Sequence, residues 1–466
     1  MTVVTYPHRT GAPSYPGTLY KRAAVLGDSI AGRHTQAPIA GSGPASQGYW
    51  SWANALVGSP FTLRNFGYSG DTVAGIAARA WQIPPSIDVV FLTAGTNDVV
   101  VFSSVASAPT VTAEVSRITG IFSSLIDRLK KAGKVVVMST IPPNNAYSSG
   151  SDSRISLLDQ VNAWINARIA DGSVLGFDLF TALWDSSLSS QRVFGGSGTY
   201  SSDGTHILNA GAYVAGKAAK VAVRAAYAAS HQVGYDPYAG CDNALYNLAQ
   251  MRTISGVSST MTYGSGTLAS GWRSLNSASG TPTLTLSNAT AYDESTEYVG
   301  PWASRVLTAD EYWQRLEISS AVGGTTVRLQ LASNLGPSGW PGGVSFGDTI
   351  FPEFEVKVVS QTNLSEVTAI AYVYFAGGTS PVDIPYTAAS TYMTSRAGTT
   401  TVAEAAQALP EAYRAVWRGN PVRVPENVSA GTALTAQVQI DCNFVGAGSA
   451  DIYLGRVSLW RANVNA

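Results

Sequence analysis

The sequence predicts two structural halves of different class, an α/β half followed by an all-β half. The first half alternates short apolar runs with longer segments of helical periodicity, whereas the second is rich in Ser, Thr, Gly and Val and loses long helical patterns. At 466 residues the chain is too long for one ordinary core. We therefore expect a first domain at 1–234, a linker at 235–255 and a second domain at 256–466.

Strand-like and helix-like segments alternate regularly through the first half. The strand-like segments are 23–27, 61–66, 88–94, 134–140 and 174–179. The segments with helical spacing are 48–57, 71–81, 110–131, 152–170 and 207–228. The run 88–94 is apolar at nearly every position, which is typical of a strand buried on both faces. This alternation predicts a parallel sheet with helices on both faces, and right-handed crossovers place the carboxyl ends of its strands at one edge.

The second half consists of short runs that alternate apolar and polar residues between turn residues. These runs are 283–286, 326–331, 354–359, 369–375 and 436–440. Such a pattern predicts an all-β sandwich. A short helix at 402–415 is the exception we expect within it.

Composition excludes several classes of protein. Apolar residues make up 45% and charged residues 13%, which indicates a globular chain. The net charge of −1 offers no electrostatic footprint for nucleic acid or for an anionic membrane surface. No apolar run is long enough to span a bilayer, and the first residues lack the pattern of a secretory signal.

Cysteine and histidine usage argues against a metal site. The two cysteines, Cys241 and Cys442, either form one disulfide or stay as isolated buried thiols. No Cys-x-x-Cys occurs, and the four histidines are scattered: His8, His34, His206 and His231. We expect no metal.

A serine and a distant histidine carry the first sign of chemistry. Ser29 follows the buried run 23–27 in Gly27-Asp28-Ser29, and Asp203-Gly-Thr-His206 precedes the last predicted helix. A serine hydroxyl needs a base to act as nucleophile, and a carboxylate three residues from His206 can orient its imidazole. The alternatives are a turn serine, a structural histidine and an Asp203 that caps the following helix.

Two further polar loops follow predicted strands. One carries Gly67 and Gly70 in Asn-Phe-Gly-Tyr-Ser-Gly-Asp-Thr, and the other carries Asn97 in Gly-Thr-Asn-Asp. An acyl-transfer site needs hydrogen-bond donors aimed at the developing oxyanion, and backbone N–H groups and an Asn side chain can supply them. Each loop taken alone is better explained as an ordinary turn.

Together the four clusters resemble the SGNH (GDSL-type) hydrolase family. The blocks appear in order as Gly-Asp-Ser-Ile from Gly27, the Gly70 loop, Gly-Thr-Asn-Asp from Gly95, and Asp203 to His206, across about residues 20–230. The change from Leu to Ile at the fourth residue of the first block is conservative. The resemblance implies a flavodoxin-like three-layer α/β/α fold and a serine esterase that needs no cofactor.

The resemblance also implies roles for these residues. Ser29 would be the nucleophile, His206 the general base and then acid, and Asp203 the residue that orients His206. The oxyanion hole would consist of the Ser29 and Gly70 backbone N–H groups and the Asn97 side chain, with Gly67 as the competing glycine.

The substrate is less constrained by the sequence. An esterase followed by a jelly-roll-like β-sandwich resembles a carbohydrate O-acetyl esterase with an accessory carbohydrate-binding module, a pairing that also occurs in phage tail proteins. A short-chain carboxylesterase or lipid esterase with a structural β domain is the alternative, and a binding protein with a silent hydrolase fold is a third reading. The tryptophans of the β half either stack on sugars or fill its core: Trp272, Trp302, Trp313, Trp340, Trp417 and Trp460.

Two expectations concern the setting of the protein. We expect an extracellular or virion-associated location, with a cytoplasmic one left open, and a substrate that is an acetylated carbohydrate or a small ester. A homo-oligomer also stays open. The segment 31–48 is polar and close to Ser29 in sequence, and it could shape a small acyl site, whereas His34 within it reads as a surface loop residue.

Overall fold

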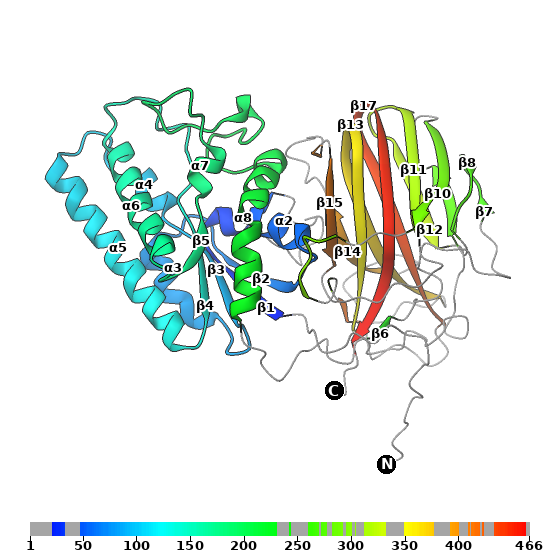
Figure 1. The fold of residues 1–466 in the computed structure, drawn as a ribbon, viewed down its shortest axis with the longest axis horizontal. Helices are drawn as coiled ribbons and strands as arrows, with labels where there is room; N and C mark the ends of the chain where they lie inside the picture. Colours follow the sequence, from blue (N-terminus) through cyan, green and yellow to red (C-terminus); the bar gives the residue numbers. More distant parts are fainter. Residues whose placement is uncertain are drawn as a thin grey trace, which may run out of the picture.

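The structure is a computed structural model, and it describes most of the α/β half and the strands of the β half (Figure 1). The described residues are 21–32, 47–230, 242–243, 260–269, 272–276, 282–291, 295–300, 303, 312–331, 349–376, 392–399, 409–410, 412–419, 422–423 and 433–462. Within these ranges, no helix has the length and apolar character needed to cross a membrane.

A five-stranded parallel sheet forms the centre of the α/β half. Its strands are β1 (Lys21–Gly27), β2 (Phe61–Gly67), β3 (Val89–Thr93), β4 (Val135–Ser139) and β5 (Leu175–Phe177). The order across the sheet is β2-β1-β3-β4-β5, and every neighbouring pair is parallel. This is the flavodoxin-like order, in which the winding reverses between β1 and β3; folds of this order bind ligands at the carboxyl ends of the strands beside that reversal. The predicted parallel sheet is confirmed.

Helices cover both faces of this sheet. The face that includes Val25 and Phe91 packs against α2 (Tyr49–Leu56) and α8 (Asn209–Ala229). The opposite face, with Leu26 and Leu92, packs against three helices: α3 (Val73–Arg79), α5 (Ala108–Lys131) and α6 (Ser153–Ala170). Side chains of a strand alternate between faces, so each strand supplies both cores. The short helices are α1 (Ser29–Gly32), α4 (Thr96–Val100), α7 (Leu179–Leu183), η1 (Ala80–Gln82) and η2 (Gly196–Gly198).

Within its described residues, the β half forms a separate mixed sheet of twelve strands. The strands are β6 (Asp242–Asn243), β7 (Thr260–Met261), β8 (Ser265–Gly266), β9 (Trp272–Asn276), β10 (Thr283–Ala291), β11 (Tyr312–Ala321), β12 (Thr326–Leu331), β13 (Thr349–Ala376), β14 (Tyr392–Thr399), β15 (Tyr413–Arg418), β16 (Val422–Arg423) and β17 (Ala433–Ala462). The long strands β13 and β17 pair antiparallel, whereas β7 with β9 and β8 with β10 pair parallel. The finer prediction, a jelly-roll-like sandwich, stays a prediction.

Two sequence predictions for the β half need correction. The runs 354–359 and 369–375 lie in one long strand, β13. The sequence shows them as two runs because register shifts near Asn363 (φ 57°) interrupt the alternation of apolar and polar residues. The predicted helix at 402–415 is wrong for 413–415, which begin β15. Tyr413, Ala415 and Trp417 lie on one face of this strand, and Val416 on the other face is buried as well. Residues 402–408 lie outside the described residues.

The two halves meet where β15 covers α2 (Figure 1). Every residue of α2 is buried, because one side packs on the parallel sheet while Trp52 lies edge-on to Tyr413 and Trp417 at ring-centroid distances of 5.2 and 5.0 Å. The Ser59 hydroxyl also donates to the Val416 carbonyl at 2.6 Å. One continuous apolar core therefore runs from the parallel sheet into the β half.

The linker and cysteine predictions can be followed only in part. Most of the predicted linker 235–255 lies outside the described residues, so the domain division stays a prediction. Cys442 is a buried free thiol, whereas Cys241 is outside the described part of the chain.

Candidate functional site

Three loops begin side by side at the carboxyl edge of the parallel sheet. Gly27, the last residue of β1, is in register with Gly67 of β2 and Thr93 of β3. The Tyr68 N–H donates to the Gly27 carbonyl at 3.0 Å, and the Asp28 N–H donates to the Thr93 carbonyl at 3.4 Å. The sheet register thus brings together the three sequence blocks that hold Ser29, Gly70 and Asn97.

Ser29, His206 and Asp203 form one chain of hydrogen bonds. The distance from Ser29 Oγ to His206 Nε2 is 2.9 Å, and the distance from His206 Nδ1 to Asp203 Oδ2 is 2.7 Å. When Nδ1 carries the hydrogen shared with Asp203, Nε2 is free to accept the Ser29 proton. The structure therefore brings together three residues that are separated by up to 177 positions in the sequence.

Asp203 is held as a carboxylate by the turn that it stabilises. Its Oδ1 accepts the backbone N–H groups of His206 at 2.7 Å and Thr205 at 2.9 Å. Burial acts to raise the pKa of Asp203, but these hydrogen bonds and the His206 ring outweigh burial and hold that pKa well below its usual range. The alternative that Asp203 caps the last helix is wrong, because the N-cap position of α8 is Leu208.

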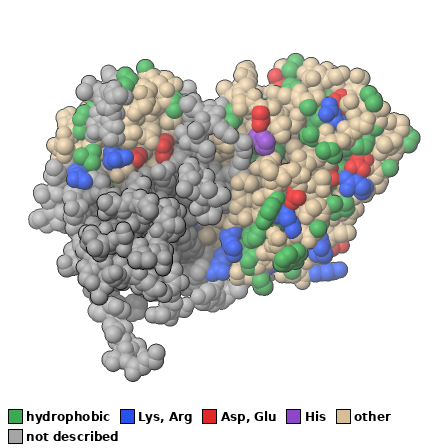
Figure 2. All heavy atoms as spheres, turned by 180° about the vertical axis from the view of Figure 1, so that it is seen from behind, with side chains coloured by type: hydrophobic (Ala, Val, Ile, Leu, Met, Phe, Trp, Pro, Cys, Tyr) green, Lys and Arg blue, Asp and Glu red, His purple; other side chains and the backbone are tan. Residues whose placement is uncertain are grey.

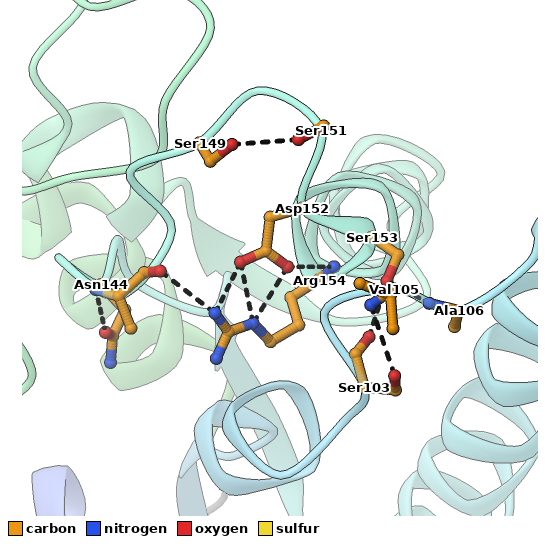
Figure 3. Close-up of polar contacts among 10 residues, drawn as sticks. Ser103, Val105, Ala106, Asn144, Ser149, Ser151, Asp152, Ser153 and Arg154 are labelled. Carbon is orange, nitrogen blue, oxygen red and sulfur yellow. Dashed lines mark hydrogen bonds and ion pairs between the residues drawn. The ribbon is translucent and has the colours of Figure 1, made fainter.

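A neighbouring loop braces the turn that carries Asp203 and His206. The Asn145 N–H donates to the Gly204 carbonyl at 2.8 Å, and Asn144 Nδ2 donates to the Thr205 hydroxyl at 3.1 Å. Figure 3 shows how this loop is held at its other end. Asp152 caps α6 and pairs with Arg154 at 2.5 Å, while Arg154 also donates to the Ala146 carbonyl at 3.2 Å.

The two candidate glycines of the second loop differ in what they permit. Gly70 has a φ of +81° and is exposed, with no atom within 4 Å of the place where a Cβ would stand, so its backbone faces open space. A Cβ on Gly67 would lie 2.2 Å from the Gly32 nitrogen. Gly67 is therefore needed for contact between β2 and α1, whereas Gly70 leaves room beside its backbone for a ligand.

Asn97 lies at the start of α4 and is tied to the Gly70 loop. Its Nδ2 donates to the Asp71 carbonyl at 2.9 Å, and an amide nitrogen has a second hydrogen that remains for a ligand. The adjacent Asp98 is buried, accepts the Val73 N–H at 2.7 Å and pairs with Arg117 at 2.8 Å. The Gly-Thr-Asn-Asp block at 95–98 thus fixes the position of the loop that carries Gly70.

Sequence reasoning missed several residues that hold these loops. Asn144 and Asn145 follow a Pro-Pro pair and look like turn residues, and Arg79 looks like an ordinary basic residue at a helix end. Their contacts with the motif loops become visible only in the structure, since no local sequence pattern marks a long-range contact.

The other candidate residues lie elsewhere or outside the described residues. Trp272, Trp313 and Trp417 are buried at 0%, 2% and 5% exposure, so these three do not offer a face to a sugar. Trp302, Trp340, the Trp460 side chain, His34, His231 and residues 33–46 are outside the described part. Among the residues that the structure does describe, no cluster could hold a metal ion. Figure 2 shows basic and acidic side chains scattered over one face among mostly uncharged ones.

The structure thus combines a parallel α/β sheet with a serine, a histidine and an aspartate in hydrogen-bond contact at its carboxyl edge. Residues 25–212 match the model of the GDSL-like Lipase/Acylhydrolase family. The α/β half is a GDSL-like lipase/acylhydrolase domain, and the protein is a serine ester hydrolase.

Several solved structures also match the chain. A putative acylhydrolase from Bacteroides fragilis is 17% identical, with 44% of this chain and 88% of that chain covered and a TM-score of 0.32. A lipolytic protein of the G-D-S-L family from Desulfitobacterium hafniense is 13% identical, covering 43% and 99%, with a TM-score of 0.32. An acetylxylan esterase from Geobacillus stearothermophilus is 20% identical, covering 47% and 96%, with a TM-score of 0.33. No curated protein sequence matches the chain.

Proposed function

We propose that Ser29, His206 and Asp203 are the catalytic residues of this ester hydrolase. The observation that carries the proposal is the unbroken hydrogen-bond chain from Ser29 Oγ through His206 to Asp203. Ser29 Oγ attacks the ester carbonyl carbon while His206 Nε2 takes its proton. His206 then gives that proton to the leaving alcohol, and an acyl-Ser29 forms. Water, deprotonated by His206, releases the acid and restores Ser29.

The oxyanion of each tetrahedral intermediate needs donors already in place. The Ser29 and Gly70 backbone N–H groups and the second hydrogen of Asn97 Nδ2 are the donors we assign. This assignment is supported by the open space beside Gly70 and by the bond that holds Asn97 to the Gly70 loop.

Replacing Ser29 tests the whole assignment. Ser29→Ala removes the nucleophile, so hydrolysis of p-nitrophenyl acetate should fall by about 10⁴-fold or more. Unchanged thermal unfolding would show that the fold is intact. A Ser29→Ala protein that keeps most of its activity would refute the assignment.

For the substrate, we propose O-acetyl groups on a polysaccharide. On the described loops that carry the site residues, Tyr68, Ser69 and Asn145 are exposed. The Asp203 side chain is 51% exposed, so the site opens directly to solvent. A site open to solvent can admit a bulky hydrated alcohol while a small acyl group reaches Ser29. A setting outside the cell, as a phage tail component or a free carbohydrate esterase whose β half acts as a glycan-binding module, belongs to this proposal.

A second candidate is a short-chain carboxylesterase whose β half is structural. It is favoured by the three buried tryptophans and by the core shared between the halves. Two measurements on the full chain separate the candidates. Acetate release from acetylated polysaccharides, compared with cleavage of p-nitrophenyl esters of increasing chain length, reports the preferred ester. Retention of inactive Ser29→Ala protein on immobilised acetylated glycan reports binding. Fast cleavage of free short esters without either glycan response would favour the second candidate.

A further inference from the structure

Arg79 connects the three segments on which the proposed oxyanion hole depends. It is the last residue of α3, and its side chain is only 12% exposed. Its Nε donates to Asp71 Oδ2, its Nη1 to the Phe66 carbonyl and its Nη2 to the Gly27 carbonyl, each at 2.5 Å. One guanidinium therefore bonds to the end of β1, the end of β2 and the loop that holds Gly70.

The positions of these three acceptors relate directly to the donors of the site. Gly27 is two residues before Ser29, and Asp71 directly follows Gly70. The Asp71 backbone carbonyl is also the acceptor for Asn97 Nδ2 at 2.9 Å. Movement of Asp71 would displace both the Gly70 N–H and the Asn97 amide relative to Ser29.

We propose that Arg79 is a positioning residue that sets the geometry of the oxyanion hole. This inference rests on the proposed function, because it concerns the donors assigned there. Arg79 touches no reacting atom in this arrangement. It acts because a planar guanidinium offers N–H groups in a fixed fork, so the distances among its three acceptors cannot change independently. The Tyr68 ring, whose centroid lies 4.4 Å from the guanidinium carbon, covers one face of the Arg79 guanidinium.

The Arg79→Lys variant tests this role. An ammonium keeps the charge beside Asp71 but carries its hydrogens on one nitrogen, so it cannot serve three separated acceptors. Small misplacements of catalytic groups cost up to about 10²-fold, so kcat for p-nitrophenyl acetate should fall by about 10- to 100-fold. KM should stay within about twofold, because an oxyanion hole acts mainly on the transition state.

Arg128→Lys is the matched control. Arg128 lies in α5, and its Nη2 donates to the Ala77 carbonyl of α3 at 2.7 Å. Arg128→Lys therefore also removes a guanidinium hydrogen bond to α3, the helix that carries Arg79. Its kinetics should match those of the wild type. If Arg79→Lys fails to fold, Asp71→Asn keeps the side-chain shape, weakens the ion pair and should lower kcat in the same way with a smaller effect.

A double-variant cycle with Asn97→Ala separates positioning from general stability. If Arg79 acts through the hole, Arg79→Lys should cost several-fold less in kcat when Asn97 is already Ala, because one donor that it positions is gone. An equal loss in both backgrounds, or wild-type kcat in Arg79→Lys and Asp71→Asn, would overturn the inference. Failure here would leave the Ser29→Ala result intact, whereas an active Ser29→Ala protein would remove the proposed function itself.

Discussion

The carboxyl edge of the parallel sheet and the seam between the two halves use charged side chains in opposite ways. At the edge, Asp203 is half exposed and its partners are backbone N–H groups and an imidazole. At the seam, Glu353 and Glu355 have no exposed side-chain surface, and each pairs with an arginine, Arg418 at 2.8 Å and Arg414 at 2.6 Å. The charge on Asp203 is open to a reacting ligand, whereas the charges on Glu353 and Glu355 are paired within the protein.

Arg418 contacts both halves of the molecule, so its substitution should have the largest effect on stability. Its Nη2 donates to the Ser59 carbonyl at 3.2 Å while it pairs with Glu353. Arg418→Met would leave a buried carboxylate without its arginine, and loss of one partner of a buried pair costs about 3–5 kcal/mol. We expect a fall of that size in the free energy of unfolding, measured by urea denaturation.

The double variant Glu353→Met/Arg418→Met is the control for this prediction. The double variant also removes the Glu353 carboxylate that Arg418→Met leaves buried and unpaired, so most of the lost stability should return. A single variant within about 1 kcal/mol of the wild type would show that the seam does not depend on its charges.

Asn97 provides the corresponding test at the edge. Asn97→Ala removes one proposed oxyanion donor, and such a loss lowers kcat by about 10²–10³-fold, or about 2.7–4 kcal/mol. Stability should change little, in contrast to Arg418→Met, so kcat and urea denaturation should be measured on both proteins. Normal kcat in Asn97→Ala would remove it from the hole.

The same contrast explains what the sequence could predict. The strands and helices of the α/β half fall close to their predicted ranges, because each has one period, clear ends and polar loops at predictable places. The four motif blocks mark Ser29, Asn97 and His206 because each lies directly beside a strand or helix end. The contacts of Arg79 and Asn145 could not be predicted, since their partners lie in other loops and depend on the sheet register.

The β half was less predictable for physical reasons. Irregular register near Asn363 divides one strand into two apparent ones, and β15 replaces part of a predicted helix because Tyr413 and Trp417 bury themselves against α2. Neither effect is visible in a local pattern. The pairing of Glu353 with Arg418 is similarly a tertiary contact over 65 residues.

Asp28 departs from this contrast, since it is a fully buried carboxyl at the edge, as is Asp98 beside Arg117. Its Oδ1 accepts the Ile30 N–H at 2.9 Å, and Asp98 and Tyr49 are ionisable neighbours. Burial raises the pKa of Asp28 to about 7, with hydrogen bonds from Ile30, Thr96 and Ala31 opposing and the Asp98 charge adding to the rise. Among the residues that the structure describes, Asp28 thus has no arginine partner of the kind that Glu353 has at the seam.

A raised pKa in the folded state has a defined effect on stability. The folded protein binds the Asp28 proton more tightly than the unfolded chain does, so this contribution is complete below the ordinary pKa of 3.8 and is lost as pH rises toward about 7. Asp28→Asn keeps the acceptor for Ile30 and cannot ionise. Between about pH 4.5 and pH 6, the wild type should therefore lose about 2 kcal/mol of unfolding free energy relative to Asp28→Asn. Urea denaturation of both proteins at each pH measures this difference. If the difference in unfolding free energy stays constant across this pH range, Asp28 is ionised in the folded protein. The edge would then tolerate a buried carboxylate without an arginine of the kind that pairs with Glu353 at the seam.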